Sequence, residues 1–200
     1  GQICDAMNAQ TAFGTYYMKI GSIALQEYSI PKMQRGNVIQ NPLENYFMFY
    51  RGIRGFALDM RRHADLLDEY LDLTEPSFLA DVDRQLAMPG ANCVYDIVMA
   101  MLMHTMMNPR QFERFDWRIV SKVLERVIAA DGKMLMRLQG ALGPLSEFLS
   151  DVPAGHLCVH SEQDDIFELR KKIPNVCLQG GMPVVLLGSG TPEECVSYAQ

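Results

Sequence analysis

The chain contains three short apolar runs, each followed by glycine, proline or polar residues and then by a segment with helical spacing. The runs cover residues 134–138, 157–159 and 176–178. Continuous apolar runs of this length are typical of parallel strands buried on both faces, and a helix after each strand completes a β-α unit. In such folds the loops after the carboxyl ends of the strands carry the functional groups. The pattern therefore predicts a parallel sheet, and it predicts that a functional site would lie at the carboxyl ends of the strands.

Periodicity and turn residues predict the remaining elements. Helices are expected over 8–29, 43–60, 64–87, 111–130, 144–149 and 165–172, with a loop over 30–43 and a turn over 89–92. A first strand is expected over 93–98, and the third strand over 156–160. Thr191 is the expected N-cap of a final helix, with Pro192 in its first position and Glu194 completing a capping box.

Four strands alternating with helices amount to about half of an eight-stranded α/β barrel. The predicted fold class is therefore α/β, part of a TIM (β/α)8 barrel, preceded by an N-terminal helical segment and loop over 1–41. The barrel portion, one domain, is expected over 42–200. A four-stranded parallel sheet leaves two exposed edges. We expect the chain to be a fragment, or another copy or chain to cover those edges.

Composition narrows the class of protein. The chain has 48% apolar residues, a net charge of −6 and a pI near 5.2. An acidic chain without a basic face is not expected to bind nucleic acid, and no apolar run approaches the ~18 residues that would span a membrane. The first ten residues lack the pattern of a signal peptide, and the five cysteines are scattered and mostly in apolar runs. We therefore expect a cytoplasmic protein with buried thiols.

Asp96, Arg137 and Gln139 are the first candidate site residues. Asp96 lies inside an apolar run, where a bare carboxylate is costly; it is either a strand-end acid facing the barrel mouth or the partner of an arginine such as Arg137. Arg137 and Gln139 alternate on one strand and therefore share a face near its carboxyl end. Arg137 is either an anion clamp or part of a salt bridge inside the barrel.

His156, Cys158 and His160 place zinc-compatible side chains on one face of a strand. The three positions span about 13 Å, too far for all three to reach one ion, so a buried cysteine between ordinary histidines is favoured over a metal site. Glu162 follows the same strand, and it either lines the site or belongs with Asp164 and Asp165 in capping the next helix.

A methionine-rich segment over 99–107 surrounds His104 and includes Met103. Methionine side chains can form an adaptable apolar wall for a large ligand, or fill an irregular core. Core packing is the favoured interpretation, with His104 and Met103 retained as candidate substrate-binding residues.

The order of segments resembles the uroporphyrinogen decarboxylase superfamily, which includes corrinoid and coenzyme M methyltransferases. The segments that carry this resemblance are FYRGIRGFALDMRRHADLLDEY (49–70), PGANCVYD (89–96), NPRQFERFDW (108–117), DGKMLMRLQG (131–140) and VCLQGGMPVVLLGSGTPEE (176–194). The resemblance implies a TIM barrel with its site at the carboxyl ends of the strands. It also implies that the first part of the barrel and its last strand-helix part are missing from these residues.

The sequence departs from both branches of that superfamily. Asp96 falls where the family has an acidic residue at a strand end, but Ile97 stands where the decarboxylases commonly have serine. The zinc methyltransferases carry His-x-Cys on the strand that is 134–138 here, where this chain has Arg137 and Gln139. Zinc is therefore not expected at that position.

The resemblance favours a uroporphyrinogen decarboxylase-like enzyme acting on a tetrapyrrole. Asp96 would be the polar anchor or proton-transfer group, Arg137 the anion clamp, and Gln139 a hydrogen-bonding neighbour. This decarboxylation would need no cofactor. The alternatives are a methyltransferase that works with a corrinoid on a partner protein, zinc-dependent methyl transfer at 156–160, and a non-catalytic half-barrel that binds or assembles. A homodimer or other assembly is expected to cover the open edges.

Overall fold

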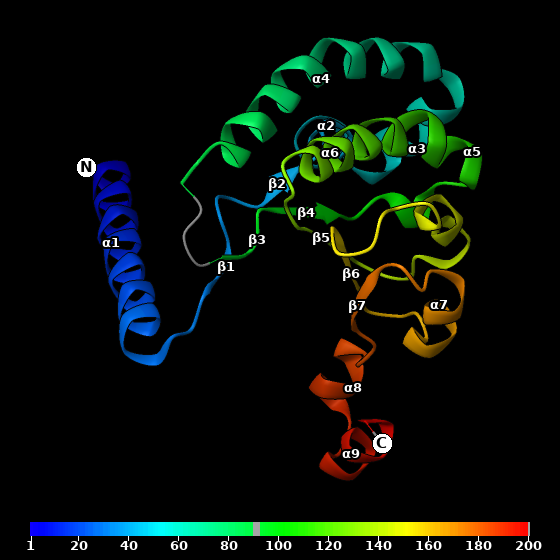
Figure 1. Ribbon diagram of the computed structural model, residues 1–200. Helices are drawn as coiled ribbons and strands as arrows, with labels where there is room; N and C mark the ends of the chain where they lie inside the picture. The colour runs from blue at the N-terminus through cyan, green and yellow to red at the C-terminus, as the bar shows by residue number, and fades with distance from the viewer. Residues whose placement is uncertain (90–92, 200) are drawn as a thin grey trace.

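The computed structural model describes residues 1–89 and 93–199. It shows an α/β fold around a five-stranded parallel sheet, preceded by a long N-terminal helix (Figure 1). The predicted turn over 89–92 includes residues 90–92, which lie outside this range. The partial-barrel fold class is confirmed, with one more strand in the main sheet than the four that were predicted.

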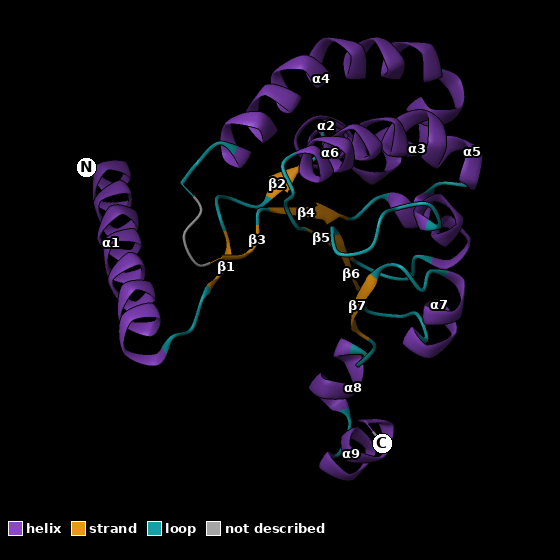
Figure 2. Ribbon diagram, in the orientation of Figure 1, coloured by secondary structure: helices purple, strands orange, loops and turns teal. Residues whose placement is uncertain are grey.

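The strands of the main sheet stand in the order β2-β4-β5-β6-β7. Their bounds are Ile39–Gln40 for β2, Ile97–Met101 for β4, Met134–Leu138 for β5, Leu157–Ser161 for β6 and Cys177–Gly180 for β7. All neighbouring pairs are parallel, as the apolar runs predicted, and Figure 2 shows these strands in orange. Strands β1 (Lys32–Gln34) and β3 (Cys93–Tyr95) form a separate parallel pair.

Two of the predicted element boundaries were wrong. The segment 93–98 is not one strand, because the chain bends at Asp96 between β3 and β4 and each part pairs with a different neighbour. The predicted loop over 30–43 contains β1 and β2, and β2 joins the main sheet. The strands there are only three and two residues long, too short to show a clear alternation in the sequence. The sheet therefore begins before residue 42.

Helices cover one face of the sheet. α2 (Pro42–Asn45), a π-helical turn (Tyr46–Arg51) and α3 (Gly52–Arg62) follow β2, and α4 (Ala64–Leu86) continues through Pro76 without a break. After β4 come α5 (Pro109–Gln111), a second π-helical turn (Phe112–Trp117) and α6 (Arg118–Ala129). In Figure 1, α3, α4 and α6 lie together on one side of the sheet. The main core lies between them and alternate residues of the strands, such as Met99, Met136 and Val159.

A ladder of ion pairs joins α4 to the helical segment over 112–129. The basic side chains recur every fourth residue and therefore lie on one helical face. They are Arg114, Arg118, Lys122 and Arg126, and their partners on α4 are Asp65, Asp68, Asp72, Glu75 and Asp83. Exposed ion pairs of this kind contribute little each, so their main effect is to set the register between the two helices.

Shorter helices follow the later strands. They are a 3-10 helix at His104–Met106, another at Gly143–Leu149, α7 (Ile166–Lys172), α8 (Val184–Ser189) and α9 (Pro192–Ala199). The predicted capping box of α9 is confirmed, because Glu194 N donates to Thr191 Oγ1 at 3.2 Å and Thr191 N donates to Glu194 Oε2 at 2.7 Å. α8 was not predicted.

The N-terminal helix α1 (Gln2–Tyr28) extends the predicted helix 8–29 by two turns toward the N-terminus, and none of its residues is buried. Figure 1 shows it standing apart from the sheet and its helices. The expectation that the cysteines are mostly buried was wrong. Only Cys158 is buried, while Cys4 and Cys177 are exposed. Within 1–89 and 93–199, no helix has the length and apolar character needed to cross a membrane.

Candidate functional site

A row of polar side chains crosses the face of the sheet opposite α3, α4 and α6. The strand register places four polar residues and one alanine side by side, in the order Gln40, Ala100, Arg137, His160 and Gln179. Residues paired in register on neighbouring parallel strands share a face. Their neighbours Met99 and Met136 belong to the core on the other face. The row therefore lies on the face that is directed inward when such a sheet curves into a barrel, near the carboxyl ends of the strands.

Arg137 is the cation of this row. It is exposed, and no carboxylate of residues 1–89 or 93–199 lies within salt-bridge distance of it. The predicted salt bridge inside the barrel is therefore not seen in the described chain. Gln139 stands just beyond the end of β5, is also exposed, and donates its backbone N–H to Met101 O at 3.1 Å. Both side chains are free to meet a ligand; their functional roles remain a prediction.

The acidic residues after β6 divide between the site and the scaffold. Asp165 caps α7 by accepting from the backbone N–H groups of Phe167 and Glu168 at 2.8 and 3.1 Å. Asp164 holds the loop after β5, because its carboxylate accepts from Leu142 N at 2.5 Å and from Gly143 N at 3.1 Å. Glu162, half-buried and directly after β6, is the acid of this group that remains available at the carboxyl end.

Asp96 does not occupy the predicted position at the barrel mouth. It precedes β4, and its carboxylate pairs with Arg35 at 2.5 Å and accepts from Lys133 N at 2.7 Å. Arg137 is paired with Ala100, four residues after Asp96, so Asp96 and Arg137 are about 13 Å apart along the strand direction. The predicted strand-end acid was wrong, and the ion-pair alternative holds with Arg35 in place of Arg137.

His104 and Met103 are buried rather than open to a ligand. Their exposed fractions are 0% and 6%, and Met103 belongs to the main core. His104 Nε2 lies 3.2 Å from Ala141 O, so the ring links the loop after β4 to the loop after β5. Burial lowers the pKa of His104. The core interpretation of the methionine-rich segment is confirmed, and the substrate-binding interpretation of these two residues is wrong for this structure.

His156, Cys158 and His160 share the inward face of the sheet but do not gather around a point. His156 Nδ1 lies 2.8 Å from Gly132 O at the start of β6, whereas His160 belongs to the polar row near its end. Within 1–89 and 93–199, no group of three or more histidine, cysteine or acidic side chains is arranged to hold a metal ion. These residues therefore do not fit a zinc site in this structure.

Two buried carboxyl groups lie beneath the loop that follows β4. Glu44 Oε1 accepts from Leu102 N at 2.6 Å and from Met103 N at 3.0 Å, and Asp116 Oδ1 accepts from Asn41 Nδ2 at 2.5 Å. Glu44 and Asp116 are each 1% exposed. Burial, and then the charge of Glu44, raise the pKa of Asp116 well above its ordinary value. Burial also raises the pKa of Glu44, while the hydrogen bonds from Met103 and Leu102 lower it. Glu44 is the acceptor that holds the loop in place.

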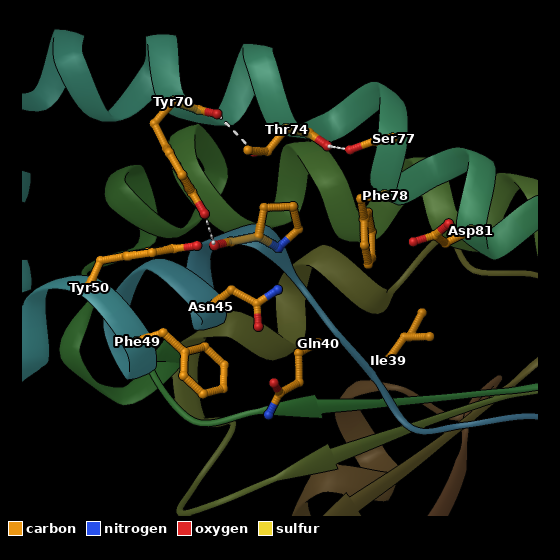
Figure 3. Close-up of a pocket in the computed structure, with 11 residues that line it drawn as sticks. Ile39, Gln40, Asn45, Phe49, Tyr50, Tyr70, Thr74, Ser77, Phe78 and Asp81 are labelled. Carbon is orange, nitrogen blue, oxygen red and sulfur yellow. Dashed lines mark hydrogen bonds between the residues drawn. The ribbon is translucent and has the colours of Figure 1, made fainter.

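A cavity of about 480 Å³ opens beside β2, at the end of the polar row (Figure 3). Gln40 belongs to both features. In Figure 3, Phe49 and Tyr50 face the cavity from the π-helical turn, while Tyr70 and Phe78 face it from α4. Tyr70 Oη donates to Pro42 O at 3.3 Å, which joins α4 to the start of α2. Polar side chains line the cavity as well, and they are Gln40, Asn45, Thr74, Ser77 and Asp81.

The sequence analysis did not identify three members of the polar row as parts of one site, namely Gln40, His160 and Gln179. Each has ordinary polar character, and only the strand register places them beside Arg137. The pair of Glu44 and Asp116 was also missed, because its members are 72 residues apart in the chain and meet only through packing. No local spacing in the sequence carries these signals.

A family model, uroporphyrinogen decarboxylase (URO-D), matches residues 42–200. No curated protein and no solved structure matches the chain. The match extends from the start of α2 to the C-terminus, covers β4 to β7 and includes Arg137, Gln139, His160 and Gln179. The parallel sheet and the helices that cover one of its faces are those of a partial TIM barrel, the fold of this family. The chain belongs to the uroporphyrinogen decarboxylase family.

Proposed function

We propose that the chain binds a carboxylated tetrapyrrole along the polar row and takes part in decarboxylation of one of its side chains. The observation that carries this proposal is the position of Arg137. It is an exposed cation without an ion-pair partner in the described chain, flanked in register by His160 and Ala100. Arginine binds carboxylates through two parallel hydrogen bonds, which fixes the orientation of the bound group as well as its position.

The chemistry assigns a different task to each side chain. Protonation of a pyrrole ring creates a positive charge that withdraws electrons from the bond to the departing carboxylate. That bond breaks, carbon dioxide leaves, and the electrons of the bond neutralise the protonated ring. A second proton then adds to the carbon that carried the carboxylate, and the first proton leaves the ring, which restores the pyrrole. In this proposal Arg137 anchors a carboxylate that is retained, His160 supplies the proton, and Glu162 stabilises the positive charge. Gln40, Gln139 and Gln179 would orient the ring system through hydrogen bonds.

The test compares Arg137→Gln with Arg62→Gln. Arg62 is an exposed arginine at the end of α3 and serves as the matched control. Binding of uroporphyrin to the 200-residue chain is followed by fluorescence quenching, and release of carbon dioxide from uroporphyrinogen is followed under anaerobic conditions. Loss of one charge-assisted bidentate contact is expected to weaken binding roughly tenfold to a hundredfold. Arg62→Gln should bind like the unmodified chain.

Equal binding by both variants would overturn the role of Arg137. Binding of cobalamin in place of uroporphyrin would point instead to the methyltransferase branch and its corrinoid partner. If His160 supplies the proton, His160→Gln should bind uroporphyrin normally but release no carbon dioxide from uroporphyrinogen.

A non-catalytic role in assembly is a second candidate, because the main sheet has two outer strands. β2 and β7 each pair on one side only within the described residues, and exposed strand edges readily pair with other chains. Phe49 and Tyr50 are also exposed beside β2. This candidate predicts a stable oligomer without decarboxylase activity. Sedimentation of the purified chain, combined with the carbon dioxide assay, distinguishes it from the catalytic proposal.

A further inference from the structure

Three of the five cysteines line one cavity at the amino-terminal end of the inward face. The cavity has a volume of about 420 Å³, and Cys93, Cys158 and Cys177 line it together with Tyr95 and His156. It lies at the opposite end of the strands from the carboxyl-end positions of Gln139 and Glu162. Neither the decarboxylation chemistry nor the assembly role uses these thiols.

Cys158 and Cys177 occupy paired positions on neighbouring strands. The register of β6 and β7 sets them directly opposite each other, so both side chains lie on the same face. Neighbouring strands lie about 4.8 Å apart, which is within the range of roughly 4.4–6.8 Å between the Cα atoms of disulfide-bonded cysteines. Oxidation therefore requires rotation of the two side chains and only a small movement of the strands.

The two thiols differ in their access to solvent. Cys177 is exposed on the outer strand β7, whereas Cys158 is 4% exposed on β6. Burial raises the pKa of the Cys158 thiol to about 11, with a hydrogen bond from Tyr95 acting in the opposite direction and the contact with Cys177 raising it further. Cys158 is therefore a protonated thiol at neutral pH, and the thiol that a soluble oxidant meets first is Cys177.

We propose that Cys158 and Cys177 form an oxidisable dithiol that reacts with hydroperoxides. The Cys177 thiolate attacks one oxygen of the peroxide, the oxygen–oxygen bond breaks, and the products are a sulfenic acid and water or an alcohol. The sulfur of Cys158 then attacks the sulfur of Cys177. The S–S bond forms, hydroxide leaves, and the proton of the Cys158 thiol converts it to water. The peroxide is reduced by two electrons, and the two thiols are oxidised to one disulfide.

The disulfide would tie β7 to β6 two residues before His160 and Gln179, which face each other in the polar row. A bond between paired positions of parallel strands requires the two Cβ atoms to approach more closely than ordinary pairing sets them, and strained disulfides are more easily reduced. We therefore expect oxidation to be reversible by a small dithiol such as dithiothreitol.

The experiment treats the 200-residue chain with hydrogen peroxide, alkylates the remaining thiols and maps the linked peptides by mass spectrometry. The unmodified chain and Cys4→Ser, the matched control at an exposed cysteine of α1, should both lose two hydrogens and yield a peptide linking Cys158 to Cys177. Cys177→Ser should yield no such peptide. Cys158→Ala should leave Cys177 as a sulfenic acid, with trapping by dimedone at least about tenfold higher than in the unmodified chain.

Far-ultraviolet circular dichroism of each variant shows whether it is folded before oxidation. If Cys158→Ala fails to fold, the linked peptide of the unmodified chain and its loss in Cys177→Ser decide the matter. A dominant link through Cys93 would overturn the proposal. So would accumulation of sulfenic acid at Cys177 in the unmodified chain without any linked peptide.

Discussion

Replacing Asp116 by asparagine should stabilise the folded chain relative to the unmodified chain, by a margin that grows as the pH rises. Asp116 is 1% exposed, and its Oδ2 atom has no hydrogen-bond partner among the described residues. Its other oxygen accepts from Asn41, and an asparagine at position 116 keeps that acceptor. The charge of Glu44 contributes to the raised pKa of Asp116, and a neutral amide at position 116 removes the repulsion between the two carboxylates. The substitution therefore removes a titrating group without creating a cavity.

The sign of the effect follows from the direction of the pKa shift. The pKa of Asp116 is raised in the folded chain, so the folded state holds the proton more tightly than the unfolded state. The stability that this proton contributes is fully present below the unfolded pKa of about 3.9. It is lost progressively as the pH rises toward the folded pKa. Asparagine is neutral throughout and loses nothing, so the difference in unfolding free energy should grow by about 1.4 kcal/mol per pH unit in this interval.

The assay is urea unfolding at a series of pH values, followed by the fluorescence of Trp117, the single tryptophan of the chain and the residue next to Asp116. The quantity of interest is the difference in unfolding free energy between variant and unmodified chain at each pH, because titrating groups that do not interact with Asp116 then cancel. Asp151→Asn is the control, since Asp151 is exposed and has no ion pair among the described residues.

A difference that stays flat with pH, as expected for the Asp151→Asn control, would refute the reasoning. It would mean that Asp116 is ionised in the folded chain at the same pH as in the unfolded chain. A difference that falls as the pH rises would be equally contrary, because it would require the carboxylate form to be the more stable form in the folded state.

Three further substitutions test the core, the end of β7 and an ion pair. Phe115→Ala should lower the unfolding free energy by about 3–5 kcal/mol, because this side chain is 1% exposed, whereas Phe167→Ala at 75% exposure should change it by less than about 0.5 kcal/mol in the same urea titration. Gly180→Ala should lower the unfolding free energy by more than about 1 kcal/mol, because φ is 104° at this position and an added Cβ would overlap the backbone carbonyl oxygen of Ser161. Calorimetry should show a lower Tm. Asp59→Asn should be less stable than the unmodified chain at neutral pH but not in acid. The Arg51 guanidinium lowers the pKa of Asp59, so the stability of this pair is present above the unfolded pKa and is lost as the pH falls through the folded pKa. The measurement is the urea midpoint of Asp59→Asn and of the unmodified chain at pH 7 and at pH 3. The same difference between the two chains at both pH values would contradict this last prediction.

The sequence predicted the elements that carry strong local signals. The strand Met134–Leu138 was predicted to the residue, because its apolar run is bounded by Gly132-Lys133 and by Gln139-Gly140. The capping box at Thr191 and Glu194 was also predicted, since it depends on residues only three positions apart. Both features are decided by neighbours in the chain.

The errors occurred where distant segments decide the outcome. A two-residue strand such as Ile39–Gln40 exists only because β4 pairs with it, and the bend at Asp96 depends on Arg35 and on the backbone of Lys133. The placement of His104 was wrong for a related reason. A histidine in an apolar segment has the same appearance in the sequence whether it lines a cavity or is enclosed by it, and only packing distinguishes the two.

The sequence by itself therefore determined the parallel α/β class, the family resemblance and the position of Arg137 near the carboxyl end of a strand. These depend on hydrophobic periodicity and on segments that are continuous in the chain. Tertiary structure alone decided which side chains stand beside Arg137, that Asp96 lies at the other end of the sheet, and that Cys158 faces Cys177. The physical reason is that strand register is set by hydrogen bonds between segments far apart in the sequence, and a shift of one residue moves every side chain to the opposite face.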